Sequence, residues 1–329
     1  MRFLPDKFTT MLVASMLLAS LLPVQGAFAD WFALATKIAV GLLFFLHGAR
    51  LSRQAVFAGF IHWKLHLSVL CATFVLFPLL GLLAGWTVPG LAQSTFYTGI
   101  LYLCVLPSTV QSSIAFTSIA GGNVSAAVVS ASASNIFGMF LTPLLVGLLF
   151  AVKGSGGGIS LDALQSILLQ LLAPFVLGQI VQPWIGGILR RHNKLTGLVD
   201  RGSILMVVYL AFSESVVSGL WHMVSWHDLA MMIAMSIALL IVVLCVTWYG
   251  SRWLGFDHAD RITILFCGSK KSLASGAPMA SAIFAGANVG SIVLPLMLFH
   301  QIQLIACAMI ARKLAQHETV ATKISAAAE

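Results

Sequence analysis

Long uninterrupted runs of apolar residues constrain this chain more than any other feature. Each run is about 20 residues long, which is the length a helix needs to cross about 30 Å of hydrocarbon. Short polar joints separate ten such runs, which lie near residues 8–28, 31–48, 64–86, 95–119, 124–151, 161–189, 202–221, 228–253, 259–284 and 289–311. Only 9% of the residues are charged, against about a quarter in soluble domains. The sequence therefore predicts an all-α polytopic membrane protein.

The joints between the runs are too short to hold a soluble catalytic or binding domain. The longest are 153–160 and 190–200, so any function must lie within the membrane. No single span carries a Ser-His-Asp, HExxH or paired-carboxylate arrangement, and the five cysteines form no CxxC pair. The segment Gly268–Ser272 lacks the first glycine of a phosphate loop. We expect neither an enzyme nor a cofactor.

The distribution of basic residues predicts how the chain crosses the membrane. If the amino terminus is cytoplasmic, the lysines and arginines of the joints fall on the cytoplasmic side, with the exception of Lys153. This asymmetry predicts a multi-pass protein of the inner (plasma) membrane with both termini in the cytoplasm. It also explains the net charge of +8 without a nucleic-acid partner.

The first apolar run has a second interpretation. It follows Arg2 and Lys7 and precedes the small-residue segment Ala27–Ala29, as in a cleavable signal peptide. The alternatives of a first span and a removed signal both remain open.

The two halves of the chain resemble each other. Ala120–Val124 (AGGNV) recurs half a chain later as Ala285–Val289 (AGANV). Helix-breaking or small polar stretches precede both copies, at Leu106–Ser113 in span four and Gly268–Ser272 in span nine. With five spans in each half, the second copy enters from the opposite face. We therefore predict two inverted repeats, residues 1–151 and 152–329, with discontinuous helices four and nine.

Paired interruptions at matching positions indicate the midplane binding site of a transporter. A break frees backbone groups that hydrocarbon cannot satisfy, and these must face protein, water, an ion or a solute. The simpler alternative is two kinked helices with packing serines.

Charged residues within the spans are the next candidates. Lys270 and Lys271 each cost on the order of 2.5–3.5 kcal/mol near a span centre, so at least one should face a water-filled cavity, an anion or an acid. Glu214 is the carboxylate well inside a span and is the natural partner of a lysine. It could equally carry a proton or only lock two spans together. His300, with Gln301 and Gln303, is a weaker signal.

Span five places hydroxyl and amide groups near the first interruption. Ser130, Ser134 and Asn135 lie among small residues, which is typical of close helix packing. The alternative is that they supply oxygen ligands to a hard cation such as sodium.

Three segments carry a family resemblance: Leu101–Asn135, Phe266–Ala280 and Leu294–Leu304. They resemble the SBF-like branch of the bile acid:sodium symporter family, and the similarity covers nearly the whole chain. The resemblance implies a panel domain of spans one, two, six and seven and a core domain of spans three to five and eight to ten. It also implies that spans four and nine cross in the core, with Glu214 facing them from the panel.

The resemblance also implies a sodium site, with Ser112, Ser113, Ser130 and Ser134 as possible ligands. The chain departs from the family at the span-nine break, where Phe266 stands near the position of the expected acid. Lys270 and Lys271 occupy the region of the expected glutamine. A fixed ammonium would then take the charge position that sodium fills in relatives.

These observations predict a secondary active, ion-coupled symporter of a small organic, anionic solute, working by alternating access in the lipid bilayer. The candidate solute- or ion-binding residues are Pro107, Gln111, Ser112, Ser113, Ser130, Ser134, Asn135, Glu214, Lys270, Lys271 and Ser272. The alternative is a non-transporting membrane regulator or sensor that has replaced the ion site by a pair between a lysine and Glu214. Solute, coupling ion, direction of transport and oligomeric state do not follow from the sequence.

Overall fold

A computed structural model describes residues 7–50, 62–94, 96–152, 161–219, 224–284 and 289–326 of the chain. The joint predicted at 153–160 and the first four residues of the second repeat motif, Ala285–Asn288, lie outside these ranges. Within the described ranges the regular structure is entirely helical. The helices are α1 (Lys7–Leu21), α2 (Ala27–Arg50), α4 (Trp63–Cys71), η1 (Ala72–Leu76), α5 (Phe77–Thr87), η2 (Leu91–Gln93), α6 (Tyr97–Val105), α7 (Gln111–Ile119), α8 (Val124–Val152), α9 (Leu161–Arg191), α10 (Asn193–Val217), α12 (Trp226–Trp253), α13 (His258–Gly268), α14 (Leu273–Ile283) and α15 (Val289–Ala326).

Seven helices in the described part of the chain are long and apolar enough to cross a membrane, which confirms the prediction of an all-α polytopic protein. They are α2, the continuous α4–η1–α5 rod, α8, α9, α10, α12 and α15. One predicted joint is wrong: residues 190–200 are helical except near His192, because α9 ends at Arg191 and α10 begins at Asn193. The polar residues there extend two helices beyond their apolar segments.

Two predicted spans are each built from a pair of short helices. α6 and α7 are separated by residues 106–110, and α13 and α14 by residues 269–272. Both breaks are narrower than the predicted polar stretches, since Gln111–Ser113 already belong to α7 and Gly268 closes α13. Pro107 lacks the N–H that would continue α6.

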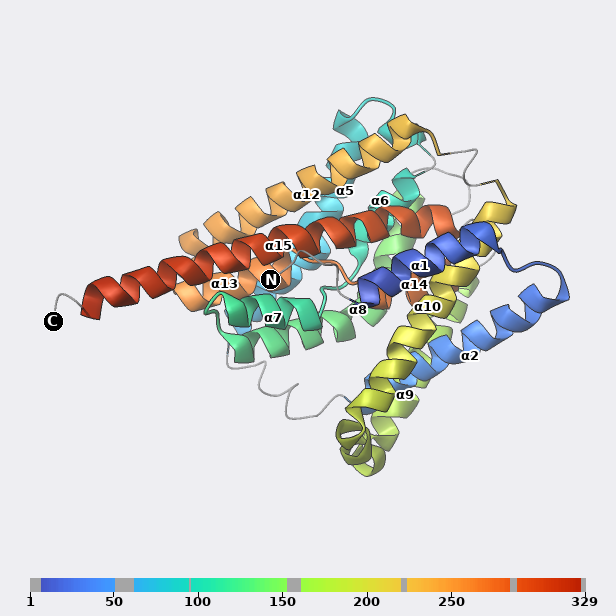
Figure 1. Cartoon of the computed structure of the whole chain (residues 1–329), viewed down its shortest axis with the longest axis horizontal. Coiled ribbons are helices and arrows are strands. Elements are labelled where there is room, and N and C mark those ends of the chain that lie inside the picture. The colour runs from blue at the N-terminus through green and yellow to red at the C-terminus, as the bar shows by residue number, and fades with distance from the viewer. Residues whose placement is uncertain are drawn as a thin grey trace.

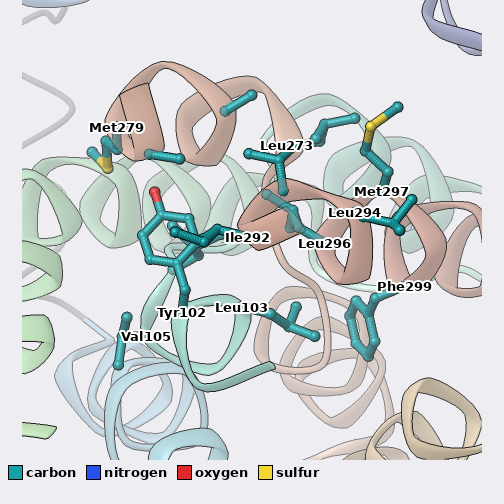
Figure 2. Close-up of a cluster of buried hydrophobic side chains, with 14 of the residues drawn as sticks. Tyr102, Leu103, Val105, Leu273, Met279, Ile292, Leu294, Leu296, Met297 and Phe299 are labelled. Atoms are coloured by element: carbon teal, nitrogen blue, oxygen red, sulfur yellow. The ribbon is translucent and has the colours of Figure 1, made fainter. Parts of the chain in front are cut away.

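Figure 1 shows how the helices are arranged in space. α1, α2, α9 and α10 gather on one side, while α12 and α15 run side by side on the other, and the end of α15 extends past its neighbours. Between them, α6 is buried along almost its whole length. Figure 2 shows Tyr102 of α6, Met279 of α14 and Ile292 of α15 in one apolar cluster. The half-helices α6 and α14 thus lie in the interior of the molecule.

Two glycines allow α2 and α9 to pack backbone to backbone. A Cβ atom added at Gly48 would overlap the Phe175 carbonyl oxygen, and one added at Gly178 would overlap the Phe45 carbonyl oxygen. Real side chains do not tolerate such contacts, so any larger residue must separate the two helices. Small residues at close contacts are typical of helix pairs in membranes.

We predict that Gly178→Ala destabilises the protein by roughly 1–3 kcal/mol, the usual cost of forcing atoms into a packed contact. Gly187→Ala is the matched control on the same helix, since a Cβ there meets nothing within 4 Å, and it should leave stability unchanged or raised. Thermal unfolding of the detergent-purified variants measures both. Equal melting temperatures for the two variants would contradict the prediction.

Candidate functional site

The two helix breaks cross and are hydrogen-bonded to each other. The Ser272 backbone N–H donates to the Pro107 carbonyl at 2.9 Å. In the other direction, the Ser108 hydroxyl donates to the Cys267 carbonyl at 2.6 Å, and the Ser113 hydroxyl donates to the Phe266 carbonyl at 3.1 Å. Pro107, Ser113 and Ser272 are therefore brought together, and each break satisfies carbonyls at the other.

Lys271 lies at the centre of this crossing and has no solvent exposure. Its Nζ donates to the carbonyl oxygens of Thr73 at 2.7 Å, Cys104 at 2.8 Å and Leu106 at 2.8 Å. An ammonium group has three N–H bonds, so all of its donors are used. The Phe77 ring covers the same group, with its centroid 4.1 Å from Nζ.

Proline positions explain why two of these carbonyls have no hydrogen bond within their own helix. Thr73 lies in the π-helical turn η1, where the Phe77 N–H donates to Ala72 instead. The next residue, Pro78, has no N–H to offer Thr73. At the end of α6, Pro107 likewise cannot donate to Cys104, and the Ser108 N–H donates to the Ser134 hydroxyl. Leu106, the third partner, has extended backbone and so leaves the helical pattern.

Lys270 is equally buried but is held differently. Its Nζ donates to the Ser112 carbonyl at 2.9 Å and lies 4.0 Å from the Phe116 ring centroid and 5.2 Å from that of Phe266. Cation–π contact replaces hydrogen bonds on the remaining sides. Phe266, which stands near the position expected for an acid, thus contributes a ring face to a lysine.

Gln303 is a site residue that the sequence indicated only weakly. It is fully buried on α15, accepts from the Lys271 backbone N–H at 2.8 Å and donates to the Lys271 carbonyl at 2.8 Å. Its Nε2 also lies 2.9 Å from His300 Nδ1. This paired contact fixes the backbone of Lys271. In the sequence, the signal for this site residue was a glutamine within an apolar span.

Two polar residues of α8, Ser134 and Asn135, bond the first break. The Ser134 hydroxyl accepts from Ser108, and the Asn135 amide donates to the Ser108 carbonyl at 2.8 Å while accepting from Ser275 at 2.7 Å. Ser130 lies one turn away and bonds His66 Nδ1 at 2.7 Å. These groups complete the wall around the break.

The first turn of α7 brings further hydroxyls together. Thr109 Oγ1 lies 2.7 Å from Ser112 Oγ and 2.9 Å from Ser113 Oγ. Gln111 is exposed beside them. Neutral hydroxyl oxygens at this spacing are able to ligate a hard monovalent cation.

Glu214 lies in a different place from the two buried lysines. It lines an open cavity of about 200 Å³ together with Lys37, Thr36 and Ser281, and the wall is completed by Ala33, Val40, Val207, Leu210, Ala211 and Val289. The expected pair between Glu214 and Lys270 or Lys271 is not formed, because backbone carbonyls and aromatic rings hold both ammonium groups. Among the described residues, an ion pair is instead formed between Arg50 and Asp200, at 2.7 Å.

The cavity lies between helices from the two sides of the molecule. α2 and α10 contribute Lys37 and Glu214, and α14 and α15 contribute Ser281 and Val289. Lys37 is a site residue that sequence reasoning set aside, although a lysine within an apolar span was the same signal that marked Lys270.

Comparison with known proteins shows the family of the chain. Residues 6–316 match the model of the SBF-like CPA transporter family. The chain is 54% identical to "Putative symporter YfeH" of Escherichia coli (strain K12), covering 94% of this chain and 92% of that protein. It is also 54% identical to "Uncharacterized protein PA2026" of Pseudomonas aeruginosa, covering 96% and 94%.

A more distant relative is "Sodium/bile acid cotransporter 7" of Rattus norvegicus, which is 29% identical over 82% of this chain and 79% of that protein. The Escherichia coli and rat relatives are described as a symporter and a cotransporter, and not as enzymes. The resemblance found in the three sequence segments is confirmed, and this multi-pass membrane protein belongs to the SBF-like CPA transporter family.

Proposed function

We propose that the protein is a secondary active symporter that carries a small organic anion by alternating access. The observation that carries this proposal is the crossing of two broken helices at a polar centre, in a molecule that also has a cavity lined by charged side chains. Helix breaks at membrane depth are typical of transporter binding sites. An intramembrane lysine and glutamate facing a cavity are likewise expected at a solute pathway.

The proposed membrane topology follows from the same helices. α1 and the broken pairs α6–α7 and α13–α14 add three spans to the seven long ones, giving ten in two inverted sets of five. α1, α2, α9 and α10 form the panel, and the remaining helices form the core. With both termini in the cytoplasm, the cavity lies in the outer half of an inner-membrane protein, and movement of panel against core would change its access.

We infer the charge and polarity of the solute from the residues that line the cavity. Lys37 provides a positive charge for an anionic group, Thr36 and Ser281 provide hydroxyls, and Val40 and Val207 provide apolar walls. Because Glu214 shares this cavity without a recorded ion pair to Lys37, a zwitterion is a second candidate solute. Its cationic end would face the carboxylate.

We expect Lys37→Ala to raise the KM for an organic anion at least tenfold, because it removes a charge-assisted contact worth about 1.5–3 kcal/mol. Small monocarboxylates, dicarboxylates, organic sulfonates and amino acids are first ranked by thermal stabilisation of the detergent-purified protein. Uptake of the best stabiliser is then measured in proteoliposomes. Lys64→Ala removes an exposed lysine on α4 and serves as the matched control.

Glu214→Gln separates the two solute classes. A transported anion should bind as well or better when the carboxylate is neutralised, whereas a zwitterion should lose affinity. Normal uptake by both Lys37→Ala and Glu214→Gln would place the solute elsewhere. Binding without flux in every ion gradient would instead favour a membrane sensor that keeps the transporter fold.

Sodium is the proposed coupling ion, with the hydroxyls of Thr109, Ser112 and Ser113 as ligands and Ser130 and Ser134 behind them. The name of the rat relative suggests this ion. We expect an inward sodium gradient to accelerate uptake and Ser113→Ala to abolish that acceleration. Ser68→Ala, an exposed serine bonded within α4, is the control. Uptake driven by a pH gradient alone would contradict sodium coupling.

A further inference from the structure

Three backbone oxygens converge on a single point, which is the position of Lys271 Nζ. They belong to Thr73 in η1, Cys104 at the end of α6 and Leu106 in the first break, and each lies 2.7–2.8 Å from Lys271 Nζ. The π-turn, Pro78 and Pro107 remove the N–H groups that would otherwise bond these carbonyls within a helix.

The surroundings of this point suit a dehydrated cation. Two of the oxygens lie at the carboxyl end of a helix, where the backbone carries partial negative charge. The Phe77 ring, 4.1 Å from Nζ, adds its negative face. No carboxylate is recorded against Nζ in the described part of the chain. Backbone carbonyls that replace a hydration shell are the ligands of monovalent cations in selectivity filters.

We propose that these three carbonyls form a monovalent-cation site and that Lys271 is its tethered occupant. The chain supplies its own ammonium where a free ion would otherwise be needed to hold the crossing together. Removing the ammonium should turn a permanently filled site into one that binds a free cation. This inference rests on the carbonyl geometry and is independent of which solute or coupling ion the protein uses.

Lys270 provides the internal comparison. It is adjacent in sequence and equally buried, yet its Nζ has one carbonyl partner, Ser112, and two aromatic neighbours. One carbonyl and two rings do not make an oxygen cage for a small hard cation. Loss of this lysine should weaken the protein without creating a cation site.

The test compares the thermal stability of full-length wild type, Lys271→Ala and Lys270→Ala in detergent, with sodium, potassium, methylammonium or choline chloride at equal ionic strength. We expect Lys271→Ala to have a lowered melting temperature in choline, because three buried carbonyls lose their donor. Sodium or methylammonium should then raise it saturably by on the order of 5 °C. Wild type and Lys270→Ala should not respond to methylammonium.

Lys271→Met and Lys271→Ser test whether the cation response depends on open space next to the three carbonyls. Methionine fills the space of the lysine stem with an apolar chain, so this variant should be destabilised and unresponsive. Serine leaves the cage open and adds a hydroxyl, so it should be rescued and is the second test if Lys271→Ala folds poorly.

Three results would overturn the proposal. The first is an equal melting temperature for wild type and Lys271→Ala in choline. The second is a cation response of Lys271→Ala that is no greater than that of Lys270→Ala. The third is failure of both Lys271→Ala and Lys271→Ser to fold in any of these salts. A sodium response of wild type that Ser113→Ala removes would report on the proposed coupling site instead. Absence of transport by the wild type, together with methylammonium rescue of Lys271→Ala, would refute the proposed function and leave the tethered-cation site standing.

Discussion

Hydrocarbon offers no hydrogen-bond partner to a backbone carbonyl, and the architecture around the two helix breaks follows from that constraint. Each unsatisfied group costs several kcal/mol at membrane depth, so a broken helix needs a donor for each carbonyl it frees. At the first break, Thr142 bonds the Val105 carbonyl, Ser272 that of Pro107, and Asn135 that of Ser108. The carbonyls of Cys104 and Leu106 bond Lys271. Side chains of α8, the Ser272 backbone N–H and the Lys271 side chain thereby replace the missing helical bonds.

The same constraint explains why a charged residue is tolerated at the most buried position. A lysine near a span centre costs on the order of 2.5–3.5 kcal/mol, whereas three unpaired carbonyls would together cost more. One ammonium group satisfies all three oxygens, so its burial lowers the total cost of the crossing. Gln303 then holds the Lys271 backbone with two further bonds, which fixes the direction of the side chain.

Much of this arrangement was predictable from local sequence. Apolar runs gave the membrane helices, and Pro107 with its polar neighbours gave the first break within a few residues. The partners of the charged groups were not predictable in this way. Glu214 is the obvious acid for Lys271 when only spans are compared, but the lysine is saturated by carbonyls whose availability depends on Pro78 and a π-turn. The contact between Thr73 and Lys271 joins residues 198 positions apart, and no periodic pattern encodes it.

The long sequence separation of these contacts also bears on the order in which the protein is made. Lys271 follows Leu106 by 165 residues. At roughly 5–20 residues per second, the ribosome takes on the order of ten seconds or more to supply the ammonium after the first break has been synthesised. During that interval the carbonyls of Cys104 and Leu106 lack the donor that they have in the folded protein. A nascent chain that stops before Lys271 therefore leaves the carbonyls of Cys104 and Leu106 without this donor.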